Sequence, residues 1–280
     1  MGELTLAALN AYWRFVMTYL DSSADSPRAF LLMEANLKQL QERRPKVAVL
    51  PWGATEAHNY HLPHGTDNTV ATAYAHHAAA AAYAKGAEVV VLPVIPFGNN
   101  AQHIDQVATI HMSTATTYAI LRDVCHSLKS QGIDRLVLVN GHGGNDFKQL
   151  VRDLQEEHKI MIVQVNVFQL IPQIKGETFP EPGNHAGDSE TSIMLHVCPS
   201  MVVMGNASSG RSVPFDIPHL KQAGVWTPRI WSKNQPDTGA GDPRPATAEK
   251  GKRVFEAGVK ALADVLVSLA AAQKGELPYV

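Results

Sequence analysis

The chain has 280 residues, 45% of them hydrophobic and 18% charged, which is enough to bury a sizeable core and is typical of a globular protein. Its formal net charge of −2 gives no electrostatic basis for binding nucleic acid or an anionic membrane surface, so neither is expected as a partner. The sequence has two cysteines, Cys125 and Cys198, and its first ten residues lack the pattern of a signal peptide. Both features favour the cytoplasm.

Residues 1–45 are expected to form a helical extension packed on the main domain, because apolar residues recur every three or four positions in 8–20 and in 30–44. Short apolar runs then alternate with helical patterns. The predicted strands are residues 46–53, 87–98, 134–140 and 159–170. The predicted helices are residues 67–86, 114–132, 146–158 and 254–273. Regions rich in Pro and Gly, 172–188 and 208–247, are expected to be loops.

The predicted strands are apolar on both faces, which is typical of a parallel sheet covered by helices on both sides. The sequence therefore predicts the α/β class, with a single domain that spans residues 1–280. Polar segments follow the first three strands: GATEAHNYHLPHGTD, FGNNAQH and NGHGGN. A fourth, NHAGDSETS, opens a later helix. Because ligands bind beyond the carboxyl ends of strands in open parallel sheets, these four segments should converge on one site.

Five side chains in these segments could bind metal. Glu56 and His58 are two positions apart, so in an extended segment they point the same way. Asp67 begins a helix and could bridge two cations, while His142 lies in a glycine-flanked turn. Glu190 is a possible third carboxylate. Mixed nitrogen and oxygen ligands suit Zn or Mn, and also Fe, Co or Ni.

Simpler interpretations of the same residues also exist. Glu56, His58 and Asp67 could belong to a hydrogen-bonded loop, and NGHGGN could be a plain glycine turn or a phosphate cradle. His61 and His64 are expected to pack within their loop, and His76 and His77 to be ordinary helical residues. Asp188 and Ser189 could cap the following helix.

The segments PWGATEAHNYHLPHGTD, FGNNAQH, NGHGGN and HAGDSETS resemble the creatininase (creatinine amidohydrolase) family, as does DPRPATAEKGKR further on. The resemblance runs from Val47 to the end of the last helix. It implies a creatininase-like sandwich with a mainly parallel sheet, two divalent metal ions, and a homohexamer built as a trimer of dimers. Carried onto this chain, it gives one metal to Glu56, Asp67 and His142, and the second to His58 and the shared Asp67. His185 corresponds to the catalytic histidine.

Two departures from the family pattern bear on the substrate. Gly144 stands where true creatininases have a glutamate that binds the second metal, and Glu190 is the candidate replacement. Glu181 stands where they have a creatinine-binding tryptophan, so creatinine is not the expected substrate. The candidate substrate-binding residues are His103, Gly143, Gly144 and Asn145.

The expected function is hydrolysis of a C–N bond in a small cyclic amide or formamide by metal-activated water. Members with the NGHGGN form resemble deformylases of formamidopyrimidine nucleotides and a peptidase of mycofactocin maturation, and either activity would fit this chain. The same loops could instead form a non-enzymatic phosphate- or nucleotide-binding module, or hold a single structural ion.

Overall fold

The computed structural model describes residues 27–181, 183–220 and 222–273. Its centre is a four-stranded sheet in the order β2-β1-β3-β4, and every neighbouring pair of strands is parallel. The strands are β1 (Val47–Trp52), β2 (Val89–Val91), β3 (Arg135–Asn140) and β4 (Met161–Asn166). The predicted α/β class with a mainly parallel sheet is confirmed.

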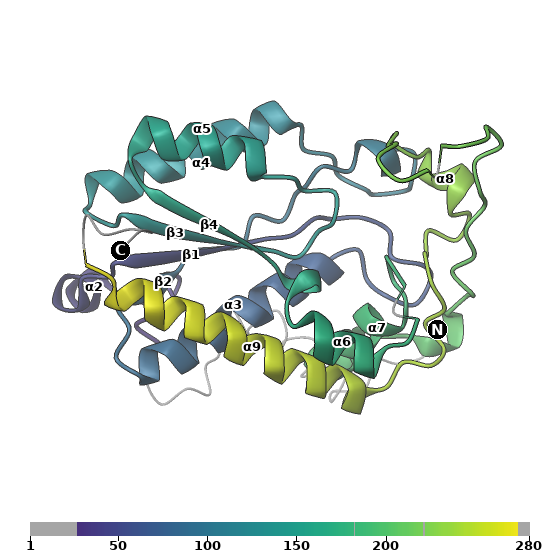
Figure 1. Ribbon diagram of the computed structural model, residues 1–280. Coiled ribbons are helices and arrows are strands. Elements are labelled where there is room, and N and C mark those ends of the chain that lie inside the picture. The colour runs from purple at the N-terminus through teal and green to yellow at the C-terminus, as the bar shows by residue number, and fades with distance from the viewer. Residues whose placement is uncertain (1–26, 182, 221, 274–280) are drawn as a thin grey trace.

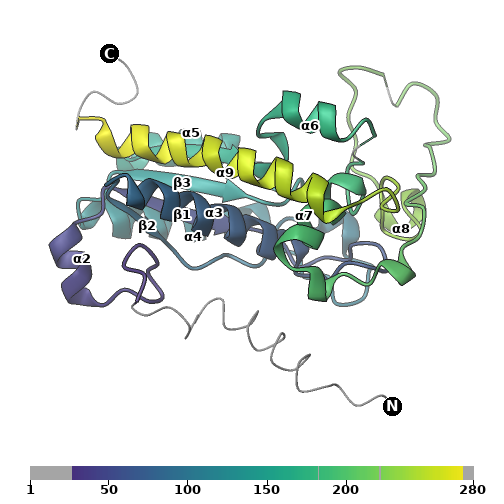
Figure 2. The ribbon, with the colours of Figure 1, turned by 90° about the horizontal axis from the view of Figure 1, so that it is seen from below.

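Helices cover both faces of this sheet (Figure 1). One face carries α4 (Thr114–Ser130) and α5 (Lys148–His158). The other carries α3 (Thr66–Ala84) and α9 (Ala248–Ala271), which Figure 2 shows running side by side along the strands. Beyond the carboxyl ends of the strands lie α6 (Pro172–Thr178), α7 (Asp188–Val197) and α8 (Trp231–Asn234). Short 3₁₀ helices span Ala101–His103, Val167–Gln169, Pro199–Met201 and Met204–Asn206.

The side chains of β1 explain why the sheet lies between two helical layers. All six of its residues are buried. Val47 and Val49 pack into the core beneath α3 and α9, whereas Ala48, Leu50 and Trp52 pack into the core beneath α4 and α5. Because successive side chains of a strand point to opposite faces, an uninterrupted apolar run is what a doubly covered strand requires.

The structure corrects several predicted boundaries. Instead of a helix over 30–44, the chain has α2 (Leu37–Arg43), which begins at a capping box between Asn36 and Gln39. Leu31, in the first part of that segment, forms a parallel bridge with Val91. The predicted strand 87–98 is shortened to β2, because Pro93 and Pro96 have no N–H to donate to a neighbouring strand. The predicted helix 8–20 lies outside the described residues.

Two helices lie where the sequence predicts loops, and a third helix begins earlier than predicted. The expected loop 172–188 contains α6, and the expected loop 208–247 contains α8. The last helix starts at Ala248 and not at residue 254, since the side chain of Thr247 caps it by accepting a hydrogen bond from the Lys250 N–H.

Candidate metal centre

Residues from four segments meet beyond the carboxyl ends of β1 and β3. The loop after β1 carries Glu56 and His58, and Asp67 is the second residue of α3. His142 follows β3, in a turn held by Asn140, whose side chain accepts from the His142 N–H (3.1 Å) and donates to its carbonyl oxygen (2.9 Å). Glu190 lies in the first turn of α7. The predicted convergence of distant segments is therefore confirmed.

The ligand atoms form two groups that share Asp67. In the first, Nδ1 of His142 lies 3.0 Å from Oε1 of Glu56 and 3.1 Å from Oδ2 of Asp67. In the second, Nε2 of His58 lies 3.1 Å from Oδ1 of Asp67 and 3.7 Å from Oε1 of Glu190. Within each group the atoms lie within 4.8 Å of one another, close enough for one cation to contact all three. The two oxygens of Asp67 thus face different groups.

Both imidazoles are oriented by main-chain carbonyl groups on their outer side. Nδ1 of His58 lies 3.0 Å from the Glu56 carbonyl oxygen, and Nε2 of His142 lies 3.1 Å from the Asn99 carbonyl oxygen. A carbonyl can only accept, so each of these nitrogens carries a proton. In the neutral tautomer the opposite nitrogen then presents a lone pair to the carboxylates, as a metal-binding histidine does.

The charged groups of the cluster shift one another's pKa values. Burial alone would lower the pKa values of His58 and His142, but the charges of Asp67, Glu190 and Glu56 outweigh it and hold both well above the ordinary value. Burial opposes ionisation of Glu190, yet the positive charge of His58 lowers its pKa to about 2. Without a cation, protonated imidazoles must balance the carboxylates, and a metal ion would displace those protons.

The donor set fits divalent cations. Oδ2 of Asp67 is buried and has no hydrogen bond of good geometry, although the His142 ring is near it, so a lone pair remains for a ligand. Glu56, Asp67, His58 and His142 are buried, and Glu190 beside them is only partly exposed, so three carboxylates so close together are costly to keep unless a cation compensates them. Such nitrogen and oxygen donors suit Zn or Mn better than a thiolate-selective ion.

His185 lies beside the two groups. Its Nε2 donates to the Ala57 carbonyl oxygen at 2.9 Å, which leaves Nδ1 facing Oε1 of Glu56 at 3.7 Å. Burial, helped by the positive charge of His58, lowers the pKa of His185, so its ring is neutral at pH 7. A neutral ring with a free Nδ1 can accept a proton. His185 also forms a third possible ligand group with Glu56 and His58.

Of the predicted substrate-binding residues, Gly143 lines the cavity at this site, and the other three lie outside its lining. His103 is buried behind Glu56, with Nδ1 2.8 Å from Oε2, and its ring lies 4.0 Å from that of Trp231. Asn145 uses its amide within the protein, donating to the Gly53 carbonyl oxygen and to Asn140. Both residues therefore support the loops of the site.

Gly144 lacks room for a side chain. A Cβ atom there would lie 2.3 Å from Nε2 of His142 and 2.5 Å from the carbonyl oxygen of Asn99. With this backbone a glutamate at position 144 would collide with a proposed ligand. Glu190 reaches the second group from α7, and its Oε2 also accepts a hydrogen bond from the Ala186 N–H at 2.7 Å.

The other two histidines of the first loop, His61 and His64, belong to none of the ligand groups, and each contacts a different segment instead of packing within its own loop. Nε2 of His61 lies 2.8 Å from Oγ1 of Thr191, and Nε2 of His64 lies 2.9 Å from the Val107 carbonyl oxygen. The capping role considered for Asp188 and Ser189 is wrong. Gly187 is the N-cap of α7, and Asp188 instead accepts hydrogen bonds from Ser192 and Lys250.

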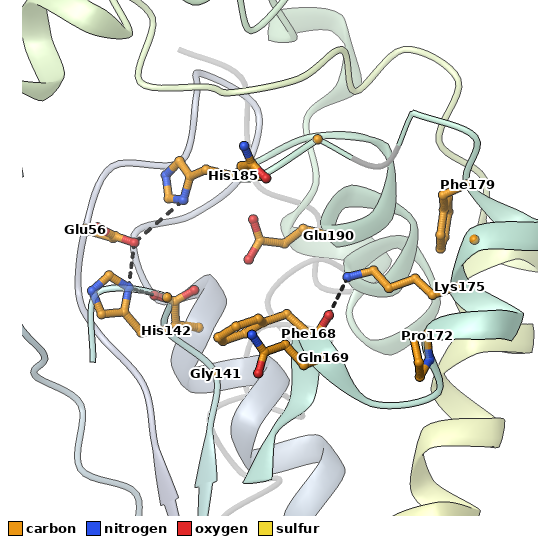
Figure 3. Close-up of a pocket in the computed structure, with 15 residues that line it drawn as sticks. Glu56, Gly141, His142, Phe168, Gln169, Pro172, Lys175, Phe179, His185 and Glu190 are labelled. Carbon is orange, nitrogen blue, oxygen red and sulfur yellow. Dashed lines mark hydrogen bonds and ion pairs between the residues drawn. The ribbon is translucent and has the colours of Figure 1, made fainter. Parts of the chain in front are cut away.

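A cavity of about 630 Å³ opens beside the cluster (Figure 3). Its far wall comes from the 3₁₀ helix Val167–Gln169, which follows β4, and from α6. The sequence predicts a strand up to residue 170 and a loop over 172–188 in this part of the chain. The residues of this wall are Phe168, Gln169, Pro172, Lys175, Gly176 and Phe179. A lysine within the apolar stretch FQLIPQIKGETF is the sequence signal that could have indicated it.

Among the described residues, no helix is both long and apolar enough to cross a membrane.

Comparison with known proteins does give matches. The creatininase (creatinine amidohydrolase) family model matches residues 33–266. A mycofactocin precursor peptide peptidase of Mycobacterium tuberculosis (strain ATCC 25618 / H37Rv) is 31% identical over 234 residues, which are 81% of this chain and 86% of that protein.

Comparison with solved structures also finds proteins named as creatinine amidohydrolase or creatininase. A Bacteroides fragilis NCTC 9343 protein, proposed to be a creatinine amidohydrolase, has a TM-score of 0.80 and 38% identity, covering 87% of this chain and 97% of its own. Creatininase in a Mn form shares the fold, with a TM-score of 0.69 and 22% identity, over 88% of this chain and 100% of its own. By its sequence match and its fold, the chain belongs to the creatininase family of amidohydrolases and is a hydrolase.

Proposed function

We propose that this hydrolase is metal-dependent, uses two divalent cations, and cleaves the C–N bond of a peptide-like amide or a formamide. The observation that carries the proposal is the position of Asp67, whose two oxygens face two separate ligand groups. Glu56, Asp67 and His142 would hold one cation, and His58, Asp67 and Glu190 the other. Zn and Mn are the proposed ions.

When bound, the two cations would supply Lewis-acid activation of a water molecule and of the substrate carbonyl. The protein itself would move the proton. His185 is neutral and its Nδ1 faces the cluster, so it can take a proton from the attacking water as the new C–O bond forms. It can then deliver that proton to the departing nitrogen as the C–N bond breaks. General acid–base catalysis of this kind contributes about a hundredfold to ten-thousandfold.

Two observations favour a peptide-like amide over creatinine. Glu181 occupies the position of the creatinine-binding tryptophan that the family pattern contains. The wall formed by the 3₁₀ helix Val167–Gln169 and by α6 contributes phenylalanine, glutamine and lysine side chains to a cavity of about 630 Å³. The relative from M. tuberculosis, named a peptide peptidase, supports the same substrate class. A formamide remains the second candidate, because the cluster would activate water against either carbonyl.

The test is elemental analysis of protein purified without added metal, repeated on Glu190→Gln. We expect two equivalents in the wild type and one in the variant, because Glu190 belongs to only one ligand group. Glu249→Gln, an exposed residue in the first turn of α9, is the matched control and should keep both. A wild type with one equivalent or none, unchanged in Glu190→Gln, would refute the two-metal proposal.

We further propose that the enzyme is a homohexamer, built as a trimer of dimers, and acts on a small molecule in the cytoplasm without nucleic acid or membrane partners. The family resemblance supports the assembly, and both cysteines being free thiols supports a reducing compartment. Sedimentation velocity should give the mass of six 30.4 kDa chains. A monomeric species at micromolar concentration would contradict the assembly.

A further inference from the structure

Lys175 places a positive charge on the cavity wall opposite the carboxylate cluster. Its ammonium points into the cavity from α6, while Glu56 and His142 lie on the other side (Figure 3). Among the described residues that line this cavity, Lys175 is the only lysine or arginine. The side chain is half-buried, so its charge is directed at the contents of the cavity and less at bulk solvent.

The charge of Lys175 has no matching carboxylate. Within the described part of the chain, Nζ donates to the Phe168 carbonyl oxygen at 2.9 Å, and no carboxylate oxygen lies within 4.0 Å. Lys250 differs, since its ammonium lies 2.8 Å from Oδ2 of Asp188. Burial lowers the pKa of Lys175 and the more distant charge of Glu190 only partly offsets this, which indicates that its charged form is incompletely stabilised. A half-buried cation of this kind is suited to an external anion.

The surroundings of Lys175 indicate what kind of anion would fit. Phe168, Pro172 and Phe179 give apolar walls, and Gln169 and Asn184 provide neutral amides. A phosphate dianion is usually held by several donors, such as arginine forks or a glycine-rich nest, and one lysine does not provide these. A carboxylate carries a single charge, which one ammonium can balance. The apolar walls suit a hydrocarbon or aromatic group next to that carboxylate.

We propose that Lys175 determines substrate specificity by binding a free carboxylate of the substrate, while Phe168 and Pro172 contact the adjacent apolar group. The substrate class is therefore an amide with a carboxylate on the part that lies away from the scissile bond, as at the C-terminus of a short peptide. This inference rests on the proposed function, because it takes the scissile carbonyl to lie at the carboxylate–histidine cluster.

The test is calorimetric binding of 4-phenylbutyrate and its neutral analogue 4-phenylbutanamide, which needs no turnover. Wild-type enzyme should bind the acid at least tenfold more tightly than the amide, both as purified and after treatment with EDTA. Lys175→Met should abolish this preference, and Lys175→Arg should retain most of it. Lys252→Met is the matched control, since its side chain is 60% exposed on α9 and the variant loses the same charge.

The binding results distinguish a carboxylate site at Lys175 from binding to the cations and from a phosphate site. Equal binding of acid and amide by the wild type, or a preference that survives in Lys175→Met, would overturn the proposal. A preference that EDTA abolishes would also overturn it, because the acid would then be binding the cations. Inorganic phosphate, tested in the same way, would replace carboxylate as the assigned anion if it bound more tightly and depended on Lys175. Absence of metal with an intact, Lys175-dependent preference would refute the two-metal mechanism and leave the carboxylate site standing.

Discussion

Main-chain carbonyl groups orient the three histidines of this site. His58, His142 and His185 each turn one ring nitrogen toward a carbonyl oxygen, at distances of 2.9 to 3.1 Å. Because those oxygens belong to the loops that form the site, the fold of the loops selects the tautomer. A substitution at one histidine should therefore remove one chemical role and leave the loops in place.

His185→Gln tests that separation of roles. We expect turnover to fall by about a hundredfold to ten-thousandfold, because the proton acceptor is lost. The two ligand groups that share Asp67 do not include His185 and should remain intact. Elemental analysis should find the wild-type metal content, and His126→Gln, on the exposed face of α4, should behave as wild type. Loss of a metal equivalent in His185→Gln would instead make His185 a ligand, through the third group with Glu56 and His58.

His61 should make stability depend on pH. Burial, together with the positive charge of His58, lowers its pKa from 6.5 to about 4, so the folded chain keeps the ring neutral where the unfolded chain protonates it. The unfolded state then binds more protons, and the free energy of unfolding falls as the pH drops from about 6.5 to about 4, by about 3 kcal/mol at most. Below pH 4 this residue causes no further loss.

Urea unfolding at several pH values measures this effect. His61→Gln should show a shallower fall in stability between about pH 6.5 and about pH 4 than the wild type. His126→Gln should keep the wild-type slope. Parallel curves for the wild type and His61→Gln would show that the burial of His61 does not set the pH dependence.

At the scale of elements, the close packing of α7 against α9 positions Glu190. A Cβ atom at Gly251 of α9 would lie 1.8 Å from the carbonyl oxygen of Ser192 in α7, so only glycine allows the two helices to approach this closely. Alanine in a helix interior gains up to about 1 kcal/mol over glycine. Overpacking against a main-chain atom costs about 1–3 kcal/mol or more, which outweighs that gain.

We therefore expect Gly251→Ala to lower the melting temperature by several degrees and, if Glu190 binds a metal ion as proposed, to lower the metal content. Gly205→Ala is the matched control, because a Cβ atom there meets nothing within 4 Å. Differential scanning calorimetry and elemental analysis measure the two effects. A melting temperature unchanged by Gly251→Ala would mean that the helices can separate at little cost.

The alternation of strands and helices was predictable because a strand covered on both faces must be apolar on both faces. All six residues of β1 are apolar, as are the four central residues of β3. The bounds of the strands were less predictable. Pro93 interrupts the pairing of β2 with β1, which returns only as an isolated bridge between Trp52 and Ile95. Leu31 pairs with β2 from a segment whose apolar spacing predicts a helix. The helix α6 was missed because PQIKGET is short and begins with proline, which a local pattern does not distinguish from a loop.

The candidate site was predictable to the extent that local motifs carry its residues. Glu56, His58 and Asp67 lie within twelve positions, and His142 lies in a turn flanked by glycines. Their spacing in the sequence is therefore enough to predict them as candidate metal ligands. Lys175 could not be found in this way. It lines the same cavity as the cluster because the chain after β4 folds through a short 3₁₀ helix into α6, which is a property of the folded chain.

For the whole molecule, the cluster links cation binding to stability. Glu56, Asp67 and Glu190 bring three carboxylates together from one loop and two helices, and only the folded chain assembles them. A ligand that binds the folded state alone stabilises it by mass action, by about 2.7 kcal/mol when its free concentration is about a hundred times the dissociation constant. For a domain of this size that corresponds to a rise of about 5–10 °C in melting temperature.

Removal of metal should therefore lower the melting temperature reversibly. We expect EDTA to decrease it by about 5–10 °C, and added Zn or Mn to restore it, as measured by calorimetry. Asp67→Asn should abolish the response, since both ligand groups lose their shared carboxylate charge, whereas Asp146→Asn, at an exposed position after β3, should respond as wild type. If Asp67→Asn kept the full response to added metal, the bridging role of Asp67 would be refuted. A wild type that did not respond to EDTA would mean that the fold tolerates three clustered carboxylates by protonating its histidines.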